Sequence, residues 1–207
     1  MIKPLLLLAT NNQGKVREYK SLLKDLPFKL VTPDEVGIAT KVEETGKTME
    51  ENARLKAVTL AGEGKLVSLA DDSGLEVDAL GGEPGHFSAR FAGAGASDKD
   101  RINYLLKRLD GVQPEKRTAR FRCVIAVATP EGNVQFCSGE CYGVVANEPR
   151  GETGFGYDPI FYLPELKKTM AELPLAVKNK ISHRGNAARQ VPSVLVKLGL
   201  LTVTTGS

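Results

Sequence analysis

Hydrophobic residues follow two different spacings along the chain, and the switches between them predict its elements. The run Pro4–Thr10 is apolar, as expected of a buried strand. A polar turn follows, and from Val16 to Leu26 apolar residues recur at helical spacing. The chain therefore begins with a strand, a turn and a helix.

A second helix is predicted to begin at Thr48, whose side chain can cap it together with Glu51 three residues later. Its apolar stripe consists of Ala53, Ala57, Leu60 and Ala61. We expect this helix to end before Gly62 and Gly64, because glycine weakens a helix interior.

An apolar strand, Leu66–Ala70, comes next and is expected to end at Asp71–Gly74. An alternating segment from Leu75 to Ala79 leads to a glycine turn. This interpretation places acidic residues at the end of a strand, where chemistry is commonly found.

Further elements follow from the same patterns. Ser97 with Asp100 opens a third helix, which Gly111 stops. The segments Ala119–Thr129 and Val134–Ala146 are separated by a four-residue turn and predict an antiparallel hairpin.

The C-terminal third combines a glycine-rich passage, Gly151–Tyr157, with a short apolar segment, Pro159–Leu163. A last helical pattern runs from Ala188 to Leu198, and Pro192 should kink or split it. Strands and helices in this order, with a hairpin among them, predict one α/β domain with a mixed sheet over residues 1–207.

Composition narrows the function classes. The chain has 207 residues, of which 42% are hydrophobic and 26% charged, so it can bury a core and is not intrinsically disordered. The formal net charge is only +3, and the basic residues between Lys107 and Arg122 are interrupted, which predicts a solvated face and no stable binding of nucleic acid.

Membrane insertion and export are not expected either. The apolar run Leu5–Ala9 is far shorter than the roughly 20 residues that cross a bilayer. The three cysteines are odd in number and lack metal-site spacing, so free thiols in a reducing cytoplasm are the simplest account.

The first candidate for chemistry is the polar turn between the first strand and helix. A helix N-terminus attracts anions through its backbone amides, and a lysine in the first turn adds a positive charge. The sequence is not the Walker phosphate-binding pattern, and an ordinary polar turn is the alternative. The candidate phosphate cradle consists of Thr10, Asn11, Asn12, Gln13, Gly14 and Lys15.

Two acidic pairs, Glu43 with Glu44 and Asp71 with Asp72, are candidate magnesium ligands. Magnesium binds through one or two carboxylates together with water and substrate oxygens. Neighbouring residues on a strand point to opposite faces, so one member of each pair is expected to face the site. Surface acidic doublets without a metal are the alternative interpretation.

Two further motifs lie near the C-terminus. Phe155, Gly156, Tyr157 and Asp158 place aromatic rings between glycines, which suits a nucleobase platform, although rings that fill the core are the commoner outcome. The segment Lys178–Arg184 begins the last helix in our interpretation and carries donors suited to keto oxygens or phosphates. His86 has no comparable neighbours and is interpreted as a loop residue.

Five segments together resemble the inosine triphosphate pyrophosphatase, or Ham1-like, family. They are LLATNNQGKVRE, VEETGKTMEENARLKA, ADDSGLEVDALGGEPGHFSARFAG, GETGFGYDPIF and ISHRGNA, in this order over nearly the whole chain. The resemblance implies a long bent mixed sheet with flanking helices in two lobes around a central cleft. It also implies a homodimer that hydrolyses ITP, dITP or XTP to the monophosphate and pyrophosphate, with a nucleotide pyrophosphatase of ordinary nucleoside triphosphates as the alternative.

The resemblance also implies roles for individual residues. Thr10 to Lys15 would bind the triphosphate, with Lys15 and Lys56 near the phosphates, and Ser73 would join these contacts. Glu44 and Asp72 would hold Mg²⁺, and Asp72 would also act as general base. The positions that match base recognition are Phe155, Gly156, Tyr157, Asp158, Lys178, His183 and Arg184.

Overall fold

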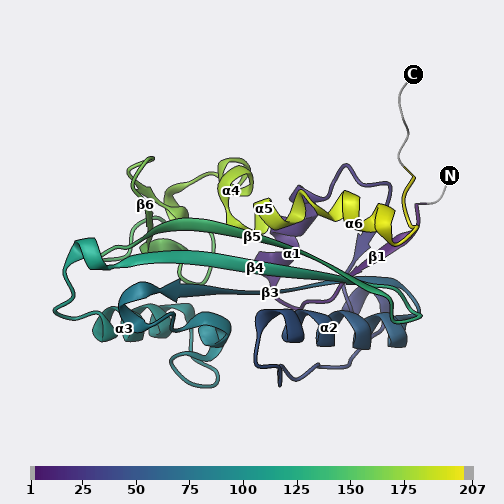
Figure 1. Ribbon diagram of the computed structural model, residues 1–207, viewed down its shortest axis with the longest axis horizontal. Helices are drawn as coiled ribbons and strands as arrows, with labels where there is room; N and C mark the ends of the chain where they lie inside the picture. The colour runs from purple at the N-terminus through teal and green to yellow at the C-terminus, as the bar shows by residue number, and fades with distance from the viewer. Residues whose placement is uncertain (1–2, 203–207) are drawn as a thin grey trace. The chain divides into compact units, whose positions relative to one another are not determined.

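The computed structural model describes residues 3–202 and contains a mixed β-sheet with helices. The strands are β1 (Leu5–Leu8), β2 (Lys29–Val31), β3 (Val67–Val77), β4 (Thr118–Ala128), β5 (Val134–Val145), β6 (Phe161–Leu163) and β7 (Lys168–Thr169). The α-helices are α1 (Gln13–Leu22), α2 (Met49–Gly64), α3 (Asp98–Arg108), α4 (Leu175–Ile181), α5 (His183–Ala188) and α6 (Val191–Lys197) (Figure 1).

The strand order is β2-β1-β3-β4-β5-β6-β7. Strand β1 pairs in parallel with β2 and β3, whereas β6 pairs antiparallel with both β5 and β7. The predicted mixed α/β class is confirmed. The single-domain organisation, the bend of the sheet and the central cleft stay predictions.

The chain forms two compact units. The first contains the described residues through Asp72, the segment Cys123–Gly139 and the described residues from Asn186 onward. The second contains Ser73–Arg122 and Glu140–Gly185. Strands β3, β4 and β5 contribute residues to both units.

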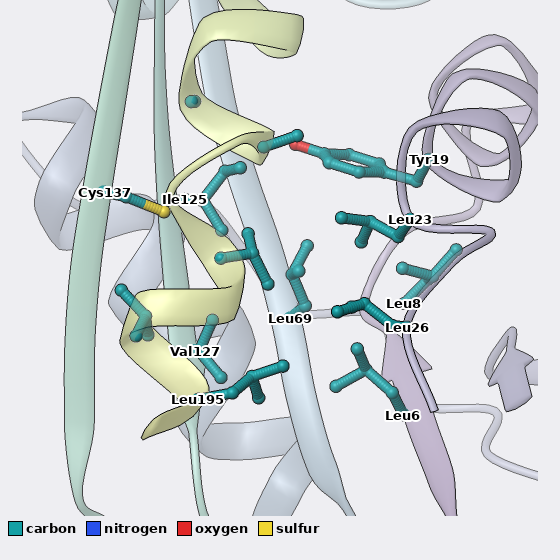
Figure 2. Packing of buried hydrophobic residues seen from close by; sticks show 14 of the residues in the cluster. Leu6, Leu8, Tyr19, Leu23, Leu26, Leu69, Ile125, Val127, Cys137 and Leu195 are labelled. Atoms are coloured by element: carbon teal, nitrogen blue, oxygen red, sulfur yellow. The ribbon is translucent and has the colours of Figure 1, made fainter. Parts of the chain in front are cut away.

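One face of the first unit's sheet is covered by α1 and α6. Figure 2 shows leucines of β1, together with Leu69 of β3 and Ile125 of β4, directed toward Tyr19 of α1 and Leu195 of α6. All of these side chains are buried, and each buried leucine contributes on the order of 1.5–3 kcal/mol of transfer free energy.

The other face of the same unit carries smaller side chains. Ala70 of β3 and the even-numbered residues at the C-terminal end of β4 pack against Ala53, Ala57 and Ala61 of α2. Both faces of this part of the sheet are covered, so neither side of β1 meets water. This explains why β1 is apolar at every position.

The second unit has its own core. Ile102, Leu105 and Leu109 of the α3 segment pack with Leu75 of β3 and Phe161 of β6. Ser97 and Asp100 form a reciprocal capping box at the start of α3, so the predicted beginning of this helix is confirmed.

Two sequence-based boundaries were wrong. Strand β3 continues through Asp71–Gly74 instead of ending there, because the acidic side chains are buried against lysines and so do not break the strand. Helix α2 continues through Gly62 to Gly64, where Lys65 adopts a left-handed conformation, because packing of its alanine stripe outweighs the weak propensity of glycine.

The C-terminal region also differs from expectation in part. Pro192 splits the last helical pattern into α5 and α6, as predicted. However, Lys178 does not begin that pattern, since it lies in α4, a separate helix that follows Pro174. The short strands β2 and β7 were not predicted.

The predicted basic face is partly exposed: Lys107, Arg108 and Lys116 are exposed, and Arg108 and Arg120 form ion pairs. Arg108 pairs with Glu83 at 2.9 Å, and Arg120 pairs with Glu76 at 2.6 Å and Glu140 at 3.3 Å. Within residues 3–202, no helix is long and apolar enough to cross a membrane.

Candidate functional site

The turn after β1 is held by its own side chains. Thr10 Oγ1 accepts the N–H of Asn12 at 3.2 Å, and Asn12 Oδ1 caps α1 by accepting the N–H of Lys15 at 3.2 Å. Asn11, Asn12 and Gln13 are exposed. The predicted cradle therefore forms a capped helix N-terminus with exposed polar residues.

Lys15 reaches from this helix to β3. Its Nζ lies 2.9 Å from Oδ1 of Asp71 and donates to the backbone oxygen of Asp71 at 3.4 Å. The Asp71 carboxylate is buried, and its Oδ2 accepts the Cys123 thiol at 3.7 Å. Asp71 therefore holds Lys15 on the face of β3 that packs against α1.

Asp72 points to the opposite face, toward α2. Its Oδ1 lies 3.6 Å from Lys56 Nζ, and the same ammonium donates to Glu44 Oε1 at 2.7 Å and to the Asp71 carbonyl at 2.8 Å. The Asp71 carbonyl thus accepts from both Lys15 and Lys56. These contacts bring the predicted phosphate and metal residues of the first unit together.

In each acidic pair, only one residue places its carboxylate beside the Lys56 ammonium. Glu44 and Asp72 flank that ammonium, whereas Glu43 is exposed and Asp71 faces Lys15. Asp71 and Asp72 therefore point to opposite faces of β3, as strand alternation predicts, and their assignment to a metal site stays a prediction.

The pKa values of this cluster reflect competing effects. Burial raises the pKa of the Asp72 carboxyl above its ordinary value, although the charges of Lys56 and Lys15 act against that shift. Burial alone would lower the pKa of Lys56, but the charges of Asp72, Glu44 and Asp71 outweigh it and raise this pKa. Lys56 is consequently a firmly protonated cation.

The donor set fits a hard divalent cation. Glu44 and Asp72 already share one positive charge, the Lys56 ammonium, and both offer carboxylate oxygens. Among residues 3–202, no group of three or more His, Cys, Asp or Glu side chains gathers as a metal site. A magnesium ion bound here would take its remaining ligands from water and phosphate oxygens.

The second unit holds the glycine and aromatic loop. Gly154 has a φ of +80°, and a Cβ there would lie 2.1 Å from Oδ2 of Asp158, so glycine is required. Asp158 Oδ2 accepts the N–H of Phe155 at 2.8 Å, and Asp98 Oδ2 accepts the N–H of Gly156 at 2.6 Å. The loop is therefore fixed from two sides.

Its two aromatic rings have different environments. Tyr157 is 4% exposed, lies in the core of the second unit and donates its hydroxyl to the Ser88 carbonyl at 3.0 Å. A nucleobase platform made of both rings is therefore wrong, because Tyr157 fills the core. Phe155 is partly exposed and remains the candidate stacking ring.

Cationic groups surround Phe155. Lys178 Nζ lies 4.9 Å and Arg184 Cζ lies 5.4 Å from the centre of its ring. Lys178 forms a buried ion pair with Asp158, and Arg184 donates to Ser73 Oγ at 2.9 Å. Two of the predicted base-recognition residues, Lys178 and Arg184, therefore lie beside the Phe155 ring.

His183 begins α5 and directly precedes Arg184. Its ring is buried and stacks on Phe121 of β4, with centroids 4.6 Å apart and an interplanar angle of 17°. Stacking of this kind fixes the plane in which the imidazole nitrogens lie.

Sequence reasoning missed several residues that shape these clusters, namely Asn52, Ser88, Asp98 and Phe121. Each acts through a partner distant in sequence, for example Asn52 through Asp72. The segment containing Asn52 carries the Thr48–Glu51 cap and part of the family resemblance, and neither assigns a role to Asn52. No periodicity distinguishes such side chains from ordinary buried or capping residues.

Gly185 offers a direct test of the packing around His183 and Arg184. A Cβ at Gly185 would lie 1.9 Å from the Asn179 carbonyl, so Gly185→Ala should lower the free energy of unfolding by about 1–3 kcal/mol. Gly62→Ala is the matched control in α2, where a Cβ meets nothing within 4 Å and should stabilise by about 0.5–1 kcal/mol. Urea unfolding followed by circular dichroism measures both, and shifts of the same sign would contradict the assigned packing.

Comparison with known proteins agrees with the sequence motifs. A family model described as Ham1 family matches residues 6–193. The dITP/XTP pyrophosphatase of Desulforamulus reducens is 51% identical over 193 residues, covering 93% of this chain and 96% of that protein. The dITP/XTP pyrophosphatase of Listeria monocytogenes is 47% identical and covers 93% and 95%.

A solved structure shows the same fold. The HAM1 protein from Coxiella burnetii superposes with a TM-score of 0.84 at 43% identity, covering 94% of this chain and 99% of that one.

Proposed function

The chain belongs to the Ham1 family, and on this premise we propose that it is a hydrolase of noncanonical purine nucleoside triphosphates such as dITP, ITP and XTP. The products are the nucleoside monophosphate and pyrophosphate. The observation that carries the proposal is the 51% identity, over 93% of the chain, to a dITP/XTP pyrophosphatase. The clusters around Lys56 and Phe155 supply the matching chemistry.

The triphosphate is assigned to the first unit. The turn Thr10–Lys15 offers amide N–H groups, polar side chains and the Lys15 ammonium, all of which favour phosphate oxygens. Lys56 adds a second ammonium close to the Asp71 carbonyl that Lys15 also contacts. Ser73 follows Asp72 directly in the chain but belongs to the second unit, and the family resemblance implies that it joins the phosphate contacts.

Glu44 and Asp72 are the residues proposed to hold Mg²⁺. When bound, the ion neutralises phosphate oxygens and helps to align the scissile bond. Asp72 accepts the proton of the attacking water, while Lys15 and Lys56 stabilise the negative charge that develops on the phosphates. Burial raises the pKa of Asp72, which makes it a stronger proton acceptor.

The purine base is assigned to the second unit. Hypoxanthine and xanthine present a 6-keto acceptor where adenine has an amino donor. Lys178 and Arg184 lie around Phe155, and His183 directly precedes Arg184 in α5. We assign these three residues as donors to the keto oxygen, an acceptor that adenine lacks. Phe155 stacks on the base, contributing on the order of 1–3 kcal/mol, while Gly156, Tyr157 and Asp158 hold the loop.

A panel of triphosphates tests the proposal. With Mg²⁺ present, the kcat/KM for ITP, dITP and XTP should be at least about 100-fold higher than for ATP, since an unpaired buried donor costs on the order of 3 kcal/mol. GTP has the same 6-keto group as ITP, so its slower cleavage has to rest on its 2-amino group. Chromatography of products should show IMP and pyrophosphate. Equal rates with ATP would support a pyrophosphatase of ordinary nucleotides, and orthophosphate as first product would contradict the reaction.

Assembly and location complete the proposal. We assign the chain to a homodimer, as its family resemblance implies, which light scattering after gel filtration measures directly. A cytoplasmic location is proposed from Cys123, Cys137 and Cys141, which are buried and form no disulfide among the described residues. Burial raises the pKa of Cys137 to about 12 and of Cys141 to about 11, so these thiols are poorly reactive.

A further inference from the structure

Asn52 lies in α2 and is fully buried, with 0% of its surface exposed. Its side-chain amide makes two hydrogen bonds to different parts of the chain. Oδ1 accepts the N–H of Gly46 at 2.8 Å, and Nδ2 donates to Oδ2 of Asp72 at 3.2 Å. A single amide therefore connects the segment that carries Glu44 to the strand that carries Asp72.

The connection requires both halves of an amide. Asparagine combines an acceptor and a donor on one rigid plane, whereas an ionised aspartate has no donor and would repel Asp72. A leucine of similar volume would make neither hydrogen bond. The chemistry of the side chain, and not its size alone, is thus matched to its two partners.

The loop side of the connection is equally close. A Cβ at Gly46 would lie 2.6 Å from Oδ1 of Asn52 and 2.7 Å from Cβ of Glu51, so only glycine permits this approach. The next residue, Lys47, donates its N–H to Glu51 Oε2 at 2.6 Å. Side chains in the first turn of α2 therefore accept hydrogen bonds from two successive backbone amides, those of Gly46 and Lys47, shortly after Glu44.

From these contacts we propose that Asn52 is a positioning residue that sets the separation of Glu44 and Asp72, so that both carboxylates can share one divalent cation. The two carboxylates already flank the Lys56 ammonium at 2.7 and 3.6 Å. The inference rests on the proposed function, because it takes Glu44 and Asp72 as the magnesium ligands.

The test measures metal affinity separately from turnover. Mn²⁺ replaces Mg²⁺ as a paramagnetic probe, and the protein is saturated with an ITP analogue whose α and β phosphorus atoms are joined by methylene. Asn52→Leu should weaken Mn²⁺ binding by about 10- to 100-fold in electron paramagnetic resonance titrations, as loss of an outer-shell partner does. Analogue binding without metal should stay unchanged, as should Mn²⁺ binding by the Gly62→Ala control in the same helix.

Gly46→Ala is a second variant, which disturbs the hydrogen bond between Gly46 and Asn52 from the side of the loop. It leaves Asn52, Glu44 and Asp72 in the chain and should weaken Mn²⁺ binding in the same direction, so it carries the test if Asn52→Leu does not fold. In both variants a raised Mg²⁺ concentration should restore much of the lost kcat, which a general loss of structure would not allow.

Two outcomes separate the inference from the proposed function. If the wild-type protein releases pyrophosphate from ITP in a Mg²⁺-dependent reaction but the folded variants bind Mn²⁺ as tightly as wild type, the role of Asn52 is wrong and the function stands. If the wild-type protein shows no such reaction, the function itself is wrong.

Discussion

Asp72→Asn should lower kcat for ITP by about 10²–10⁴-fold, the range for loss of a general base. The substitution keeps the shape of the side chain but removes its ability to accept a proton and halves the carboxylate pair near Lys56. Because Lys15, Lys56 and the turn after β1 remain, the substrate should still bind. Pyrophosphate release and calorimetric titration with ITP measure the two effects separately.

Glu43→Gln is the matched control, since Glu43 is an exposed acidic residue beside Glu44. Its kcat should equal that of the wild type. Full turnover in Asp72→Asn would remove Asp72 from the chemistry. A wild-type protein that binds ITP but never cleaves it would instead favour a nucleotide sensor.

Lys178→Met should lower the free energy of unfolding by about 3–5 kcal/mol, because it leaves a buried carboxylate without its ammonium partner. Lys178 and Asp158 are each only 3% exposed in their side chains and form an ion pair. Water does not replace the lost charge at such a depth. Urea unfolding monitored by circular dichroism gives the free energy directly.

Two controls make this result specific. Adding Asp158→Asn should recover most of the loss, because the unpaired charge disappears while an amide oxygen can still accept the Phe155 N–H. Lys20→Met breaks an ion pair whose side chains are both 48% exposed, and should cost less than about 1 kcal/mol. Equal losses in Lys178→Met and Lys20→Met would contradict the buried ion pair.

Sequence patterns correctly predicted those helix boundaries that depend on residues close together in the chain. Thr48 and Ser97 cap the helices that their spacing indicated, and Pro192 divides α5 from α6. The same local patterns wrongly predicted that the strand ends at Asp71–Gly74. The strand continues because lysines from α1 and α2 neutralise its carboxylates. That neutralisation depends on tertiary contacts.

The candidate sites divide in the same way. The turn at Thr10 was predictable because its hydrogen bonds join residues two and three positions apart. Strand alternation predicted that Asp71 and Asp72 point to opposite faces, whereas the role of Asp72 followed only from the family resemblance. Tyr157 could not be assigned from sequence, since only its contact with Ser88, 69 positions away, shows that the ring belongs to the core.

The alternation of Asp71 and Asp72 across β3 makes the reaction sensitive to strand alignment. A slip of β3 by one residue that put Leu69 in the place of Ala70 would also put Asp71 in the place of Asp72. Ala70 would then lie opposite Lys15, which would lose its carboxylate partner. The same slip would drive Leu69 into the alanine-lined face of α2, where overpacking costs about 1–3 kcal/mol. The unequal sizes of Leu69 and Ala70 therefore favour the register of β3 that places each aspartate beside its own lysine.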